Sequence, residues 1–180
     1  MLHLSLAARI ALASAFFGLL VAGGAIVLGL HALAQQLEAR AATELRGKRD
    51  LLTHLIERNR RHPLPHAWMA QWHVLKVQQG WADDPKREAQ LALDATRRAL
   101  DSDPGCSLAM TAEGFVHTNL QRDLDAGSRR YEQALQCNPN DSLAWLLKGT
   151  LHAFRGEGAQ AVAGTQQALR LSPLDPLRYF

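Results

Sequence analysis

Residues Asn138 to Gly149 read NPNDSLAWLLKG, and residues Asp103 to Gly114 read DPGCSLAMTAEG. The two stretches begin 35 positions apart, and each has a proline, a Ser-Leu-Ala triplet and a glycine at the same offsets. Self-similarity at a period of about 20–50 residues is the mark of stacked structural repeats. This stretch therefore predicts a repeat architecture for the second half of the chain.

The prolines extend the pattern in both directions. Pro63, Pro104, Pro139 and Pro173 are separated by 41, 35 and 34 residues, and the last two spacings match a period of about 34 residues with one inserted residue. The longer first repeat has an insertion between its two helices, QQGWADDPKRE, at residues 78–88. We predict about three helix-turn-helix repeats that stack because a single helix pair cannot bury its apolar face alone.

These residues carry a resemblance to a known family. Residues 64–180 resemble tetratricopeptide-repeat (TPR) regions found in bacterial adenylate/guanylate cyclases and in membrane-anchored winged-helix regulators. Three stretches carry this resemblance: WHVLKVQQGWADDP, RDLDAGSRRYEQALQCNPNDSLAW and LRLSPLDPLRYF. The positions that match the TPR signature are Trp145, Gly149, Ala161, Ala168 and Pro173 in the third repeat, Gly114, Tyr131, Ala134 and Pro139 in the second, and Ala92, Ala99 and Pro104 in the first. Neither a cyclase domain nor a winged helix is found, so neither activity is implied.

The first thirty residues predict a membrane anchor. Ile10 to Leu30 contain no charged residue, and about 21 helical residues span about 31 Å, close to a bilayer core. A cleaved signal peptide ending near Ala32–Ala34 is the alternative, although signal h-regions are shorter. The small residues Ser14, Gly18 and Ala22 share one helical face, which would allow a homodimer contact; the alternative is that they are simply the small residues common in any such helix.

The stretch ELRGKRDLLTHLI, with Glu44, Leu45, Gly47 and His54 among its residues, carries a second resemblance. Residues 4–57 resemble the N-terminus of heavy-metal-type sensor histidine kinases. That resemblance implies a bacterial inner-membrane protein with its repeats on the periplasmic side. The predicted fold is all-α, with an N-terminal tail at 1–9, a transmembrane helix at 10–31, a membrane-proximal helix at 32–62 and a TPR domain at 63–180.

Several function classes find no support in the sequence. The chain carries 20 Lys and Arg against 17 Asp and Glu, and a nucleic-acid-binding protein gathers its basic residues on one face. The only local cluster, Arg58, Arg60 and Arg61, predicts a solvated helix end. GEGAQA at residues 156–161 follows a helix instead of a strand, so it predicts a turn and not a dinucleotide site. We predict no enzyme activity, no cofactor, no metal and no nucleic-acid partner.

Partner binding is the function that the repeats favour. In TPR proteins the first helix of each repeat lines the binding face, and by register that face includes His73, Lys76, Phe115, Asn119, Thr150 and Phe154. By resemblance, Asn119 and Lys76 match positions that grip peptide backbones and carboxylates. We predict a scaffold that binds proteins or peptides at the membrane. The alternative is a sensory module that lacks its output domain.

The two cysteines lie at opposite ends of the second repeat. Cys106 starts its first helix and Cys137 ends its second, and two antiparallel helices bring such ends together. A disulfide is then possible in an oxidising compartment, with two free thiols as the equal alternative.

Overall fold

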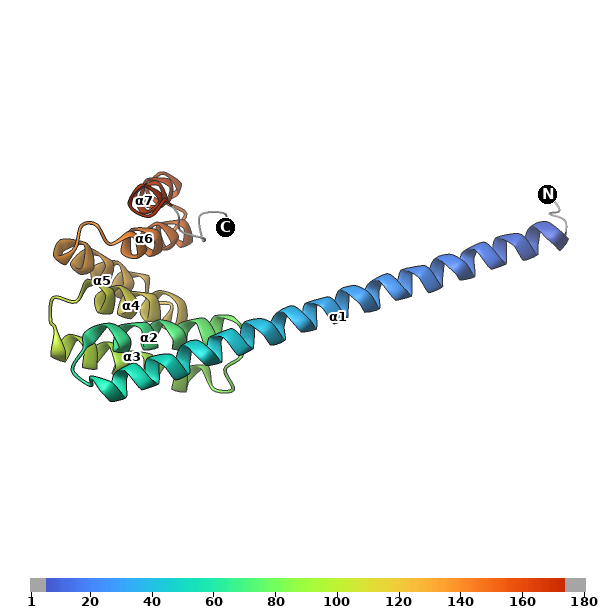
Figure 1. Ribbon diagram of the computed structural model, residues 1–180. Coiled ribbons are helices and arrows are strands. Elements are labelled where there is room, and N and C mark those ends of the chain that lie inside the picture. The colour runs from blue at the N-terminus through green and yellow to red at the C-terminus, as the bar shows by residue number, and fades with distance from the viewer. Residues whose placement is uncertain (1–5, 174–180) are drawn as a thin grey trace. The chain divides into compact units, whose positions relative to one another are not determined.

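The computed structural model describes residues 6–173, with side chains from residue 31 onward. In this part of the chain every regular element is helical (Figure 1). The elements are α1 (Leu6–Arg58), α2 (Pro63–Gln78), α3 (Pro85–Ser102), α4 (Ser107–Val116), the π-helical turn η1 (His117–Gln121), α5 (Leu124–Cys137), α6 (Ser142–Phe154) and α7 (Gly158–Leu171). The predicted all-α class is confirmed.

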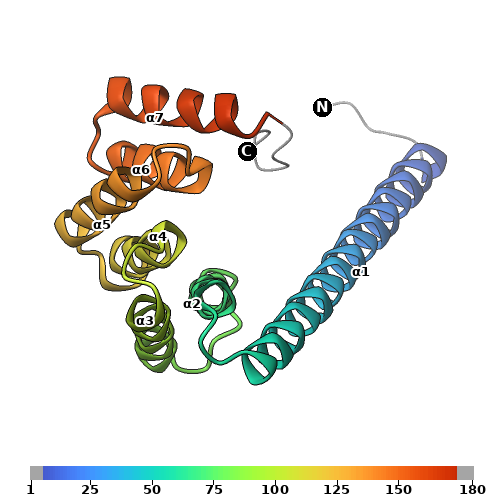
Figure 2. The ribbon, with the colours of Figure 1, turned by 60° about the vertical axis from the view of Figure 1, so that its left-hand side comes forward.

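The chain divides into two compact units, Met1–Gly47 and Lys48–Phe180, with α1 crossing the boundary. The second unit contains the repeats. Within it α2 pairs with α3, α4 with α5, and α6 with α7, and the pairs are joined through α2 against α4 and α4 against α6 (Figure 2). This is the stacking that the repeated sequence predicts.

Aspartates fix where the repeat helices begin. Asp84, Asp123 and Asp141 directly precede α3, α5 and α6, and each side chain accepts a hydrogen bond from a backbone N–H in the first turn. Such a cap satisfies one of the N–H groups that a helix start leaves without a partner. The starts of these three helices are therefore set by the local sequence.

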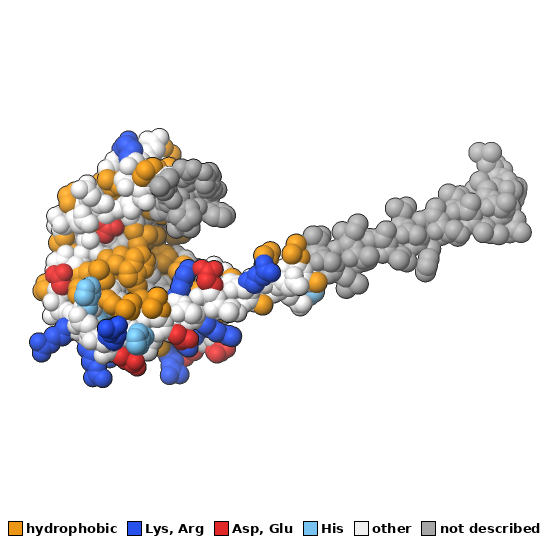
Figure 3. Space-filling model, viewed as in Figure 1, with side chains coloured by type: hydrophobic (Ala, Val, Ile, Leu, Met, Phe, Trp, Pro, Cys, Tyr) orange, Lys and Arg blue, Asp and Glu red, His pale blue; other side chains and the backbone are white. Residues whose placement is uncertain are grey.

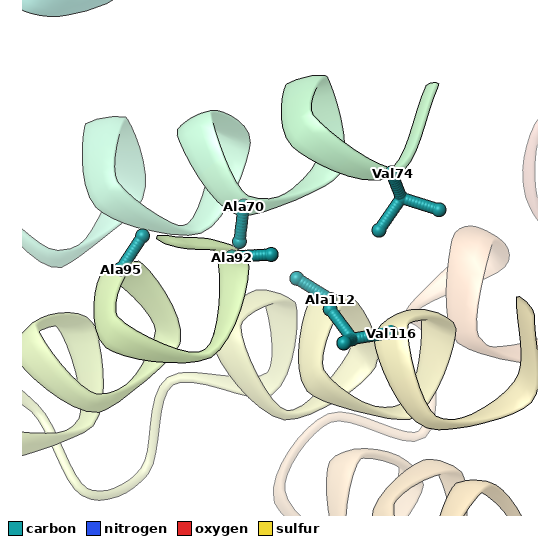
Figure 4. Close-up of a cluster of buried hydrophobic side chains, with 6 residues drawn as sticks. All are labelled: Ala70, Val74, Ala92, Ala95, Ala112 and Val116. Carbon is teal, nitrogen blue, oxygen red and sulfur yellow. The ribbon is translucent and has the colours of Figure 1, made fainter. Parts of the chain in front are cut away.

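Small side chains let the paired helices touch. The core between α2, α3 and α4 consists of Ala70, Val74, Ala92, Ala95, Ala112 and Val116 (Figure 4). In the third repeat, a Cβ atom added at Gly149 would lie 3.1 Å from the carbonyl oxygen of Ala161, which is tighter than an ordinary contact. The predicted role of Gly149 and Ala161, to allow close helix approach, is thus seen directly.

The inserted residue of the second repeat coincides with the π-helical turn. Gly114 and Gly127 are 13 positions apart, whereas the matching Gly149 and Ala161 are 12 apart. η1 lies inside the longer interval, and a π-helical turn holds one residue more than an α-helical turn would. The extra residue is therefore absorbed at the end of α4, and the later helices keep their register.

The loop insertion of the first repeat is shorter than the sequence predicts. Only residues 79–84 connect α2 to α3, because Pro85 begins α3 and the predicted loop residue Glu88 lies in its first turn. A proline at the first helical position loses no hydrogen bond, since that N–H has no partner within the helix.

The predicted membrane location is contradicted. Among the described residues we find no helical segment with the length and hydropathy that a bilayer span requires. α1 continues without a break past residue 31, and this part of the helix carries the exposed charged residues Glu38, Arg40 and Glu44. The predicted inner-membrane, periplasmic localisation is therefore wrong. The structure describes no side chain among residues 10–30. The predicted dimer face, Ser14, Gly18 and Ala22, falls in this range.

Candidate functional site

His73 and Lys76, two of the predicted binding residues, share one carboxylate. Glu88 accepts a hydrogen bond from His73 Nδ1 at 2.5 Å and from Lys76 Nζ at 2.5 Å. The Glu88 side chain is almost fully buried. The two residues therefore join α2 to α3, and a ligand carboxylate would have to compete with Glu88 for Lys76.

The charge state of this cluster follows from its burial and its contacts. Burial raises the pKa of Glu88, but the hydrogen bonds from Lys76 and His73 outweigh it and leave that pKa below its usual value. Burial lowers the pKa of His73 more than Glu88 raises it. At neutral pH Glu88 is therefore ionised, and His73 is neutral and donates from Nδ1.

Asn119 lies in the π-helical turn η1 and is held in place by two hydrogen bonds. Its Nδ2 donates to the carbonyl oxygen of Phe115 at 3.2 Å, and its Oδ1 accepts from Gln78 Nε2 at 2.8 Å. The second bond links the first repeat to the second. The position of the Asn119 amide is therefore fixed by groups from two repeats.

Asn119 and Phe154 line the same open hollow. It has a volume of about 420 Å³ and is bordered by Thr118, Asn119, Arg122, Leu124 and Phe154. Phe154 ends α6 and is 57% exposed, so an aromatic ring of the third repeat faces a polar turn of the second. An amide, a guanidinium and an exposed ring at one hollow are suited to a peptide that carries both polar and apolar groups.

A second hollow of about 410 Å³ lies on the other side of this turn. Asn119 and Arg122 also line this hollow, together with Val77, Lys86, Gln90 and Leu93. The segment from Asn119 to Arg122 therefore separates two hollows, one toward the first repeat and one toward the third. A ligand that crosses this segment would contact all three repeats.

Arg122 is the residue that the sequence reasoning did not identify. Its backbone is left-handed, with φ 57° and ψ 28°, and its N–H donates to the carbonyl oxygen of His117. Among the described residues nothing pairs with its guanidinium. The 35-residue spacing between Pro104 and Pro139 could have indicated an irregular turn in this repeat. A repeat with one residue more than the usual 34 must accommodate that residue by a local change in its backbone.

The remaining predicted residues are placed differently. Phe115 packs against the core beside Val116 and is only partly exposed. Thr150 is exposed, and its hydroxyl donates to the carbonyl oxygen of Leu146, one turn earlier in α6. Neither lines the two hollows around Asn119, so their part in binding stays a prediction.

Cys106 and Cys137 are both free thiols in the structure. Cys106 is buried and packs with Ala67, Ala99 and Ala109, whereas Cys137 is exposed at the end of α5. Burial raises the pKa of Cys106. Their pairing under oxidising conditions stays a prediction.

Comparison with known proteins supports the TPR-like fold. No protein-family model matches the chain. A DnaJ homolog subfamily C member 7 homolog from Schizosaccharomyces pombe (strain 972) is 31% identical over 85 residues, or 46% of this chain and 17% of that protein. The chain thus spans less than a fifth of the length of this curated relative.

Among solved structures, TTC0263, a thermophilic TPR protein in Thermus thermophilus, superimposes with a TM-score of 0.60 at 20% identity, covering 73% of this chain and 67% of that one. A double mutant of MamA RS-1 reaches a TM-score of 0.48 at 13% identity over 74% and 69% of the two chains, which is too weak to bear on the fold. The predicted resemblance to sensor kinases gains no support from these comparisons. What they show is a TPR-like helical fold.

Proposed function

We propose that this chain is a protein-interaction scaffold whose repeats bind a segment of a partner protein at the Asn119–Arg122 turn. The observation that carries the proposal is the hollow where Asn119 and Arg122 of the second repeat meet Phe154 of the third. The TPR-like fold supports it, because stacked helix pairs present an extended surface that suits a peptide better than a small molecule.

The proposed contacts follow from the chemistry of the three side chains. Arg122 offers a free guanidinium for a carboxylate or for backbone carbonyl groups. Phe154 offers an exposed ring for an apolar side chain, and the fixed Asn119 amide borders the same space. The ligand that fits is a short segment with an apolar residue next to an acidic group or a chain end.

A selection from a random-peptide library against the full chain tests the proposal. We expect selected peptides to lose at least about tenfold in affinity with Asn119→Ala, Arg122→Ala or Phe154→Ala, since interface energy concentrates in a few residues. Val162→Ala is the matched control, because Val162 is exposed to the same 57% as Phe154 but lies on α7. Peptides that bind all four variants equally would overturn the proposal.

A further inference from the structure

A third hollow, strongly apolar, lies at the corner between α1 and α2, inside the unit Lys48–Phe180. It has a volume of about 360 Å³, and its apolar walls are Leu52 and Leu55 of α1 and Leu64, Pro65 and Trp68 of α2. Leu55, Leu64 and Trp68 are 40%, 43% and 47% exposed. A tryptophan this exposed inside an apolar hollow is typical of a surface that a partner covers.

The turn that joins the two walls is firmly held. Buried His66 donates from Nε2 to the carbonyl oxygen of Arg60 at 3.0 Å. The backbone N–H of His62 donates to the carbonyl oxygen of Asn59 at 3.1 Å, and His62 Nδ1 accepts from the N–H of Leu64 at 3.3 Å. The hollow is therefore preformed, which lowers the entropy cost of binding.

One cation–π contact joins the C-terminal part of α1 to α2, and a second lies within α2. The guanidinium carbon of Arg49 lies 6.0 Å from the ring centroid of Trp72, and Lys76 Nζ lies 5.6 Å from the same centroid. Both distances are within the range of cation–π attraction. The contact of Arg49 with Trp72 supports the orientation of the α1 wall.

Arginines occupy the rim of this hollow. Arg58 lines it, and Arg60 and Arg61 belong to the turn between Asn59 and His62, which both line it. All three side chains are exposed, and none has an ion-pair partner among the described residues. With Glu57 as the one acidic neighbour, residues 54–62 carry a charge of +2 from three arginines and one glutamate. Figure 3 shows hydrophobic side chains gathered on one face of the repeat helices, with basic and histidine side chains below them.

From this arrangement we propose that the α1–α2 corner binds an acidic amphipathic helix of a partner protein. An apolar stripe on that helix would pack on Trp68, Leu64 and Leu55, as in other helix-in-groove complexes. Its acidic side chains would pair with Arg58, Arg60 and Arg61, whose charge is otherwise unmatched. Arginine and tryptophan are also the residues on which interface energy most often depends. This surface shares no residue with the Asn119–Phe154 hollow, so the proposal is independent of the function proposed above.

The probe is a fluorescent synthetic helix of about 16 residues, with leucine at positions three and four apart and glutamate elsewhere. One control peptide replaces glutamate by lysine, and the other replaces leucine by serine. With the full chain we expect the acidic amphipathic peptide to bind at least about tenfold more tightly than either control. We also expect its affinity to fall several-fold between about 0.05 M and about 0.5 M NaCl.

Variants of the protein locate the site. Trp68→Ala and the triple variant Arg58→Glu, Arg60→Glu, Arg61→Glu should each weaken binding at least about tenfold. The matched controls are Leu91→Ala and the triple variant Lys86→Glu, Arg87→Glu, Arg98→Glu on α3, which makes the same change in net charge at exposed residues. These controls, and Asn119→Ala with Phe154→Ala, should stay within about twofold of the unchanged protein. All the substituted residues are exposed or partly exposed, and circular dichroism verifies that each variant keeps its helix content.

Four results would overturn the proposal. The lysine peptide could bind as well as the acidic one, or both triple variants could weaken binding equally, which would indicate long-range attraction only. Vesicles of phosphatidylcholine and phosphatidylglycerol could displace the peptide through Trp68 and the arginines, which would make a lipid surface the occupant. The chain could also self-associate in a manner that Trp68→Ala abolishes, which would make a second copy the occupant.

Discussion

The ring of Tyr131 fills the space that the missing side chain of Gly114 leaves. A Cβ atom at Gly114 would lie 2.6 Å from Cε1 of Tyr131, far inside contact distance. Tyr131 is fully buried, and its hydroxyl lies 3.3 Å from Thr118 Oγ1 in the π-helical turn. The packing of Tyr131 on Gly114 therefore joins α5 to α4, and the contact of Tyr131 with Thr118 joins α5 to η1.

Gly114→Ala should destabilise the protein. The added methyl group forces the buried ring to move, and overpacking of this kind costs about 1–3 kcal/mol, more than the roughly 1 kcal/mol that alanine gains in a helix interior. Urea unfolding followed by circular dichroism measures the change. Gly47→Ala in α1 is the control, because nothing lies within 4 Å of a Cβ atom there, and it should be neutral or stabilising. Equal stability of the two variants would contradict the proposed packing of Gly114 and Tyr131.

Arg122→Gly should raise stability while it weakens partner binding. A left-handed backbone costs a side-chain-bearing residue about 1–2 kcal/mol relative to its preferred conformations, and glycine is free of this cost. We expect a gain of about 1 kcal/mol in the free energy of unfolding and at least a tenfold loss of affinity for library-selected peptides, because the guanidinium is removed.

Arg129→Gly on the exposed surface of α5 is the control for this variant. It should lower stability by about 1 kcal/mol, the ordinary cost of glycine within a helix. If Arg122→Gly were destabilising by a similar amount, the left-handed conformation of Arg122 would be wrong.

The cluster of Glu88, His73 and Lys76 should make stability depend on pH in two separate windows. The pKa of Glu88 is lowered in the folded state, so its contribution is complete above its unfolded pKa and is lost as the pH falls through the folded value. The pKa of His73 is lowered from 6.5, so the unfolded chain takes up a proton first and stability falls as the pH drops below about 7.

Glu88→Gln separates the two windows. The variant should lose about 1–3 kcal/mol at pH 7, because Lys76 loses its charged partner and the neutral amide of glutamine cannot replace it. Its further loss of stability below about pH 5 should be smaller than in the unchanged protein, whereas the loss between about pH 7 and pH 5 should remain. Glu132→Gln, at an exposed carboxylate with Lys148 3.6 Å away, should change stability by less than about 0.5 kcal/mol. Identical pH profiles for the unchanged protein and Glu88→Gln would show that Glu88 is not the acidic group concerned.

Cys106 should react far more slowly than Cys137 with a neutral alkylating reagent. The thiolate is the reactive form, and burial both raises the pKa of Cys106 and shields its sulfur. Near pH 8 the rate for Cys106, measured by mass spectrometry in Cys137→Ser, should be at least about tenfold below that for Cys137 in Cys106→Ser. The two rates should converge in denaturant, and a faster Cys106 in the native protein would contradict its burial between α2, α3 and α4.

The sequence predicted the repeats well because their packing depends on residue size. Gly149, Ala161 and Ala134 lie where helices touch, and a larger side chain at such points would be excluded whatever the rest of the repeat contained. Helix starts were equally predictable in principle, since Asp84 and Asp141 cap helices through bonds within three residues.

The contacts of the predicted binding residues could not be predicted from the sequence, because register gives the face of a helix but not the contacts of each side chain. Lys76 and His73 lie on α2 as expected, yet both are bonded to Glu88, which the sequence placed in a loop. The 35-residue spacing shows that the second repeat contains one additional residue, but it does not show the position at which the backbone accommodates it. Arg122 became visible only through the left-handed turn that the extra residue produces.

The π-helical turn also has a consequence for how this chain could evolve. A residue inserted within a stacked helix would rotate every later side chain by about 100° and misalign the next repeat. At the end of α4 the same insertion is confined to η1 and the turn to Asp123, and it leaves the contacts of Ala134 and Asp141 with α4 in place. If the Asn119–Arg122 turn binds the partner as proposed, a change in length at this point would alter ligand preference and leave the fold unchanged.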